Sequence, residues 1–144
     1  MIDRIMREVR RNIEGSGQHV FIIFPESVRE PGFAYTIGNA GRGLPELLLI
    51  GSFPPALAGR ILNELGAKMR EDGRPLPEGL VDIGWTFPFK IRKAGPAARL
   101  RFTIQVGRYL GHERYDVLQV MICDAGGRYP GEKGCDPDFD VEQP

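Results

Sequence analysis

Apolar residues near the N-terminus recur every three or four positions, which is the spacing of one helix face. The stripe runs from Ile2 to Ile13, and the arginines of this segment lie largely off it. The pattern predicts an amphipathic helix over residues 2–14, within an N-terminal segment of residues 1–17, that packs one face on a core. Gly15 and Gly17 are expected to end this helix.

Five later segments have the patterns of strands: 19–25, 33–37, 47–50, 81–91 and 117–123. The first, third and fifth are nearly continuous apolar runs, which are typical of buried strands. Residues 33–37 alternate, so their side chains should face two sides of a sheet. In 81–91 every second residue is apolar, which predicts one long strand with one buried face. Pro88 places that strand at a sheet edge or in a bulge.

Two further segments indicate helices. Pro54 and Pro55 suit a first helical turn, the apolar stripe continues to Met69, and Gly73 stands where a left-handed C-cap belongs. Residues 97–110 fit both strand and helix spacing. Residues 124–144 are rich in turn-forming residues, which predicts an irregular C-terminal tail.

This order of elements predicts an α+β fold in a single domain of residues 1–144. Strands with short connections favour antiparallel pairing, so we expect a mainly antiparallel sheet of about five strands with two or three helices. A split-barrel-like closure of the sheet is an alternative arrangement.

The charges add to this picture, because 19 basic and 19 acidic residues give a net charge of zero. This balance argues against a nucleic-acid or membrane-surface partner. Residues 85–114 are mainly basic and the tail from Glu132 is mainly acidic. We interpret these as faces that pair with each other or are solvated, with an anionic-ligand patch as the alternative. The sequence shows no secretory signal pattern and no apolar run of membrane length, so we expect a cytoplasmic protein with reduced thiols.

The glycine-rich stretch NAGRGLPE, residues 39–46, could be a phosphate-binding loop or a connection between strands. Gly38 and Gly43 have the spacing of the two glycines of a P-loop, but Leu44 and Pro45 replace its Lys and Ser/Thr. A strand also follows the stretch, where a P-loop requires a helix. A strand connection with special backbone angles is therefore the favoured interpretation.

The remaining candidates for chemistry are weak. His112 could act as an acid or base, but a solvated loop histidine is the more common case, and His19 opens a strand. Asp136, Asp138 and Asp140 resemble the start of a calcium loop without its glycine. We predict no metal site and no cofactor, with flavin as an alternative. The aromatic residues of 81–91 are expected in the core rather than in a stacking platform.

Several segments together resemble one bacterial family, the domain of unknown function numbered 4262. They are GFAYTIG, PELLLIG and YDVLQVMICDAGGRYPGE, and the resemblance extends over roughly residues 19–140. The family commonly has a histidine where this chain has Leu44, a leucine in place of Asn39 and a tryptophan in place of Gly131. If that histidine serves a site, the site is altered here. The resemblance implies helix for residues 97–110 and carries no assigned activity.

We therefore expect a ligand- or protein-binding module without catalytic machinery, acting on an unknown small molecule or protein, with a homodimer as an open alternative. A flavin- or nucleotide-binding enzyme of split-barrel type and an immunity or defence-linked interaction protein are the competing hypotheses. The predicted site lies where the strand at 33–38, the loop at 38–46 and residues 124–129 would converge. Its candidate residues are Tyr35, Thr36, Asn39, Arg42, Glu46, Gln119, Asp124, Arg128 and Tyr129.

Overall fold

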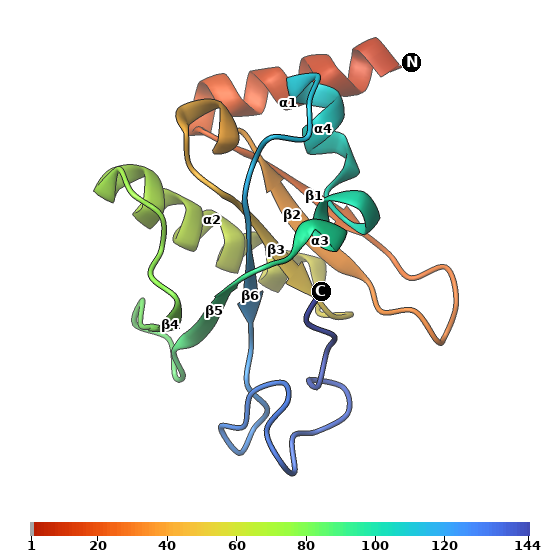
Figure 1. The fold of residues 1–144 in the computed structure, drawn as a ribbon, viewed down its shortest axis with the longest axis vertical. Helices are drawn as coiled ribbons and strands as arrows, with labels where there is room; N and C mark the ends of the chain where they lie inside the picture. The colour runs from red at the N-terminus through yellow and green to blue at the C-terminus, as the bar shows by residue number, and fades with distance from the viewer. Residues whose placement is uncertain (1) are drawn as a thin grey trace.

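Six strands form one open sheet in the order β1-β2-β3-β6-β5-β4 in the computed structural model, which describes residues 2–144 (Figure 1). The strands are β1 (His19–Ile23), β2 (Phe33–Ile37), β3 (Glu46–Ile50), β4 (Gly79–Val81), β5 (Phe89–Lys93) and β6 (Val117–Met121). The helices are α1 (Ile2–Ser16), α2 (Pro55–Asp72), α3 (Pro96–Arg101) and α4 (Ile104–Leu110), with a 3-10 turn, η1, at Ala40–Arg42.

Four of the five strand pairs are antiparallel, and only β3 and β6 run parallel. The predicted single α+β domain with a mainly antiparallel sheet is confirmed. The split-barrel alternative is wrong, because β1 and β4 are open edges that do not pair with each other. Since β3 and β6 are parallel, their carboxyl ends lie at the same end of the sheet. The carboxyl end of β1 lies at that end too, because β1 and β3 are both antiparallel to β2 between them.

The predicted long strand at 81–91 is wrong. The segment divides into β4 and β5, which pair as an antiparallel hairpin with Val81 opposite Phe89. Two local features break the pattern. Gly84 has φ of 90° and donates its N–H to the carboxylate of Asp82, 2.8 Å away, and Pro88 lacks a backbone donor. The alternation of apolar residues arises because side chains of the turn, such as Ile83 and Trp85, pack against the core. The division of the segment into β4 and β5 raises the number of strands from the expected five to six.

Helices cover both faces of the sheet (Figure 1). One face packs against α2, whose buried residues include Ile61, Leu62, Leu65 and Met69. Burial of each such side chain contributes about 1.5–3 kcal/mol. The prolines at its start and the left-handed Gly73 at its end are confirmed.

The opposite face of the sheet packs against α1, α3 and α4. Val9 of α1 is fully buried there. Residues 97–110 are helical, as the resemblance implied, but they form two helices, which raises the helix count to four. The break falls at Thr103, whose hydroxyl and carbonyl groups both bond to the buried phenol of Tyr115.

The strand at residues 19–25 was expected to be buried, and this is wrong. β1 is a sheet edge and its side chains are half-buried to exposed. An edge strand has a neighbouring strand on one side only, whatever its composition. An apolar run alone therefore cannot distinguish an edge strand from a central strand. No helix among the described residues is long and apolar enough to cross a membrane.

The tail after β6 is irregular, as predicted; it loops beyond the end of the sheet, and its last residues return to it (Figure 1). Arg101 of α3 makes two hydrogen bonds of 2.8 and 2.9 Å to the carboxylate of Glu142. Arg92 of β5 donates to the backbone oxygen of Pro144. The basic and acidic segments thus pair at these points.

Candidate functional site

Glu46 is fully buried beneath the glycine-rich loop. Its carboxylate accepts hydrogen bonds from the backbone N–H groups of Gly38 (3.0 Å), Asn39 (3.3 Å) and Ala40 (2.9 Å), and from the hydroxyl of Thr36 (2.8 Å). Burial raises the pKa of Glu46 above its usual value, and these hydrogen bonds oppose the rise. The arrangement fixes the loop to the first residue of β3.

Successive backbone N–H groups that converge on one point form a concave site of the kind that binds phosphate groups. In this loop the donors from residues 38–40 are occupied by the side chain of Glu46. The loop therefore resembles a phosphate cradle because its N–H groups surround acceptor oxygens, and those oxygens belong to the side chain of Glu46. This geometry supports the interpretation as a strand connection.

A second layer of polar contacts ties this loop to α1 and α2. Gln18 and Asn39 are buried, and the amide nitrogen of Asn39 donates to the side-chain oxygen of Gln18 (3.0 Å). The guanidinium of Arg70 donates to both Gln18 (2.6 Å) and the side-chain oxygen of Asn39 (2.9 Å). Arg42, by contrast, is exposed on η1. The network explains how three elements are joined at this end of the sheet.

Tyr35 and Gln119 lie on the sheet face that α3, α4 and the tail cover. The phenol of Tyr35 accepts the backbone N–H of Gln105 (3.4 Å), and burial raises the pKa of Tyr35 to about 12. Gln119 accepts from Arg92 (2.9 Å) and donates to the backbone oxygen of Glu142 (2.8 Å). Each has protein partners, and the two do not bond to each other.

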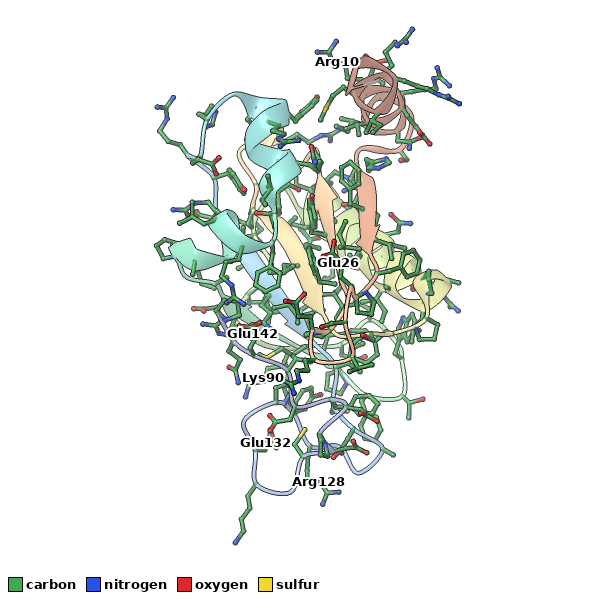
Figure 2. The ribbon with its side chains drawn as sticks, turned by 90° about the vertical axis from the view of Figure 1, so that its right-hand side faces the viewer. Arg10, Glu26, Lys90, Arg128, Glu132 and Glu142 are labelled. Carbon is green, nitrogen blue, oxygen red and sulfur yellow. The ribbon has the colours of Figure 1, made fainter. Side chains whose placement is uncertain are left out.

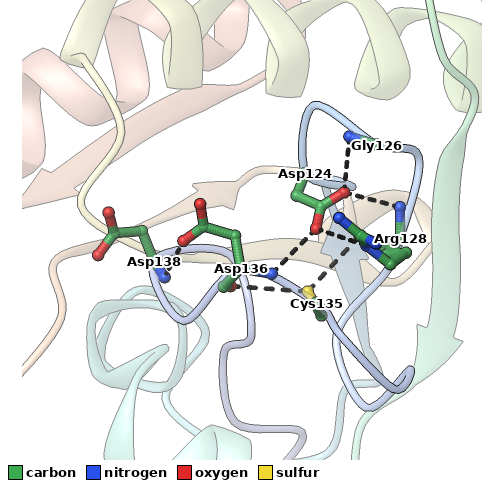
Figure 3. A network of polar contacts seen from close by, with 6 residues as sticks. All are labelled: Asp124, Gly126, Arg128, Cys135, Asp136 and Asp138. Carbon is green, nitrogen blue, oxygen red and sulfur yellow. Dashed lines mark hydrogen bonds and ion pairs between the residues drawn. The ribbon is translucent and has the colours of Figure 1, made fainter.

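Asp124, Arg128 and Tyr129 lie in the turn that follows β6. The carboxylate of Asp124 accepts the backbone N–H groups of Gly126, Arg128 and Asp136, each at 2.9 Å, and the guanidinium of Arg128 at 3.2 Å (Figure 3). These bonds, chiefly those from backbone N–H groups, lower the pKa of Asp124 to about 2. The carboxylate organises the turn and the start of the tail.

Acidification should therefore loosen this turn. The folded pKa of Asp124 lies near 2, below its ordinary value of 3.8. Its contribution to stability is thus fully present above about pH 4 and is lost as the pH falls toward 2. The free energy of unfolding, measured by urea denaturation at pH 5, 4 and 3, should decline more steeply for the wild type than for Asp124→Asn. Parallel pH profiles for the two proteins would contradict this assignment.

The phenol and the two thiols near this turn are not activated. Tyr129 donates its hydroxyl to the backbone oxygen of Pro88, and burial raises the pKa of Tyr129 to about 12. Burial likewise raises the pKa of Cys123. Both cysteines are free thiols, and Cys135 lies with its sulfur 3.5 Å from the backbone oxygen of Arg128. A raised thiol pKa disfavours the nucleophilic thiolate.

The expected convergence of these groups at one site is wrong. Glu46 pairs with Val117 at the beginning of the parallel strands, whereas Asp124 follows Met121 at their end. The length of β6, Val117–Met121, separates the two groups. The candidates therefore form separate groups at the two ends of the sheet and on one face, and their role in binding a ligand stays a prediction.

A different region is hollowed. Two adjoining cavities lie at the carboxyl ends of β1 and β3, and both are lined by Gly51, Ser52 and Phe53. The larger, of about 750 Å³, lies between the β1–β2 loop and tail residues 137–142. The smaller, of about 310 Å³, lies between β1, β2 and the start of α2. We call the pair the sheet-end cleft.

Sequence reasoning missed this cleft because its walls come from three segments without a motif. One signal was available in the β1–β2 loop. Phe24 and Val28 stand among polar and turn-forming residues, and their side chains are 67% and 105% exposed. Large apolar side chains left in solvent beside a cavity are typical of binding surfaces.

Comparison with known proteins identifies the family to which this chain belongs. The family model described as "Domain of unknown function (DUF4262)" matches residues 12–136. The chain belongs to the DUF4262 family. No curated protein and no solved structure matches it. Membership confirms the resemblance seen in the sequence.

Leu44 stands where DUF4262 members were expected to carry a histidine. It is 8% exposed and packs in the core cluster on the α2 side of the sheet. Its backbone N–H donates to the oxygen of Asn39 (3.0 Å). An apolar side chain fits this position, which lies two residues from the buried Glu46.

The two histidines of this DUF4262 chain are far from a catalytic arrangement. His19 is half-buried, contacts the side chain of Asn12 (2.8 Å), and has a pKa lowered by burial. His112 accepts the backbone N–H of Arg114 within its own loop. Across residues 4–144, whose side chains the structure describes, no group of three or more His, Cys, Asp or Glu is placed to hold a metal ion.

Proposed function

We infer that this DUF4262 domain is a binding module that takes a small organic ligand in the sheet-end cleft. The observation that carries this proposal is the pair of cavities joined at Gly51–Phe53, each of a size typical of small-molecule sites. The polar candidates elsewhere, apart from the exposed Arg42, are engaged in networks within the protein, whereas the cleft is a hollow that is open to a ligand.

The position of the cleft in the fold supports this proposal. It lies beyond the carboxyl ends of β1 and β3, and β3 is one of the two parallel strands. The residues just after β3 belong to a short connection to α2, so rigid elements hold the cleft from two sides.

Phe53 is the residue that should matter most, because it lines both cavities and its ring centroid lies 5.7 Å from that of Phe139. We expect small aromatic fragments, titrated into ¹⁵N-labelled protein, to shift the amide resonances of Gly51–Phe53 and of residues 137–142 in a saturable way. Phe53→Ala should abolish these shifts.

Leu100→Ala is the matched control, because Leu100 is 72% exposed and lies on α3, outside the lining of the cleft. It should leave the fragment shifts unchanged. Fragments that shift only the amides of residues 38–46, or a Phe53→Ala protein that binds as the wild type does, would reject the proposal.

A further inference from the structure

We propose that the sheet-end cleft accepts an amphipathic cation, meaning a molecule that carries an ammonium or similar cationic group on an aromatic or other apolar body. This inference rests on the proposed function and specifies the chemical class of its ligand. It follows from the different linings of the two cavities and from the charges that the protein itself leaves unpaired.

The smaller cavity suits the apolar part of such a ligand. It is lined by side chains such as Ile22, Phe33, Ala34 and Ala58, and no charged residue contributes to it. A dry cavity of about 150 Å³ can hold a benzene molecule, so a volume of about 310 Å³ accommodates one ring and a short chain. Burial of that ring would supply the apolar part of the binding energy.

The larger cavity carries an excess of negative charge. Four carboxylates line it against one guanidinium, that of Arg29. The carboxylates belong to Glu30, Asp138, Asp140 and Glu142. An anionic ligand would meet an excess of like charge here, whereas a cation would be attracted, because the walls of a cleft strengthen the field of charges that line it.

Two of these carboxylates are available to a ligand. Glu142 is paired with Arg101, and Asp140 accepts the backbone N–H of Gly131. Among the side chains of residues 4–144, which the structure describes, no hydrogen bond or ion pair engages the carboxylates of Glu30 and Asp138. The two come from opposite walls, one from the β1–β2 loop and one from the tail.

Two aromatic rings line the sheet-end cleft. Phe53 belongs to both cavities, and Phe139 belongs to the acidic one. The face of an aromatic ring attracts cations at distances up to about 6 Å. A cation in the acidic cavity would share that cavity with Phe53 and Phe139, and Phe53 also lines the apolar cavity for the body of the same molecule.

The test uses three compounds that share one apolar body and differ in charge: 4-phenylbutylamine, 4-phenylbutanol and 4-phenylbutyrate. Each is titrated into the full ¹⁵N-labelled chain at low salt. We expect the amine to bind with a dissociation constant at least about tenfold lower than that of the carboxylate, with the alcohol between them. The advantage of the amine should decline with added salt, because the attraction is electrostatic and partly exposed.

Asp138→Asn and Glu30→Gln should each weaken amine binding several-fold and leave alcohol binding unchanged. Glu132→Gln is the control, because Glu132 is an exposed acid of the same tail that does not line the cleft (Figure 2). Equal binding of all three compounds, or tighter binding of the carboxylate, would overturn the inference and leave the proposed function standing. Absence of cleft shifts with all three would overturn both.

Discussion

Glu46→Leu should lower the free energy of unfolding by about 3–5 kcal/mol, because it removes the acceptor of three buried donors and one partly buried donor. The hydroxyl of Thr36 and the backbone N–H groups of residues 38–40 all donate to this carboxylate. Leucine fills a similar volume and accepts none of these bonds. Glu46→Gln keeps one acceptor oxygen and should therefore cost less. Urea denaturation followed by circular dichroism measures both values.

Glu71→Leu provides the control, because Glu71 is exposed on α2 and engages no partner among the described residues. It should change the free energy of unfolding by no more than about 0.5 kcal/mol. If Glu46→Leu were equally mild, the carboxylate would not be what fixes the loop.

The pH dependence of the free energy of unfolding of Glu46→Leu, compared with the wild type, tests whether the carboxyl group of Glu46 is buried. Because burial raises the folded pKa of Glu46 above its ordinary 4.5, the folded state binds more protons than the unfolded state just above that pH. The contribution of Glu46 to stability is therefore greatest below pH 4.5 and declines as the pH rises through its folded pKa. The stability advantage of the wild type over Glu46→Leu should shrink from pH 4 to pH 7, and an advantage that grows would show the opposite shift.

The glycines of the same loop should differ sharply in their tolerance of a methyl group. Gly38 has φ of 126°, and a Cβ there would lie 2.8 Å from the backbone oxygen of Gly17. Strain and the clash with backbone together should make Gly38→Ala cost about 3 kcal/mol or more. Gly43 has φ of 77° with open space around it, so Gly43→Ala should cost about 1 kcal/mol.

Gly41→Ala completes the series, because Gly41 has open space and no left-handed φ. Its effect should lie within about 1 kcal/mol of zero, with stabilisation as the favoured direction, since alanine restricts the unfolded chain. The urea concentration at the denaturation midpoint should be highest for Gly41→Ala, lower for Gly43→Ala and lowest for Gly38→Ala. Three equal effects would mean that the glycines act only through chain flexibility.

Much of the fold could be predicted because local sequence carries it. The helix at 2–14, the strands at 33–37 and 47–50, and the cap at Gly73 follow from periodicity and glycine chemistry, and the structure confirms them. The segment at 81–91 shows the limit. Its alternation is real, but Gly84 and Pro88 prevent a continuous strand.

The candidate site was harder to predict, because polar residues in a chain give no indication of their partners. Asn39 and Glu46 attracted attention as polar residues beside glycines, and in the structure they bond to other parts of the protein. The sheet-end cleft depends on Phe53 and Phe139, which are 86 residues apart and come together through the path of the tail. A contact between residues so far apart in the sequence leaves no local pattern from which it could be predicted.

The sequence by itself determined most of the helices and strands, the apolar faces of the helices at 2–14 and 55–72, and the family to which the chain belongs. Only the tertiary structure decided that β6 inserts between β3 and β5, that β1 is an edge, and that Glu46 rather than a ligand occupies the glycine-rich loop. The physical reason is that strand pairing uses backbone groups that every residue except proline presents alike. Side-chain periodicity fixes the face of a strand, and the choice of its neighbours depends on the packing of the whole core.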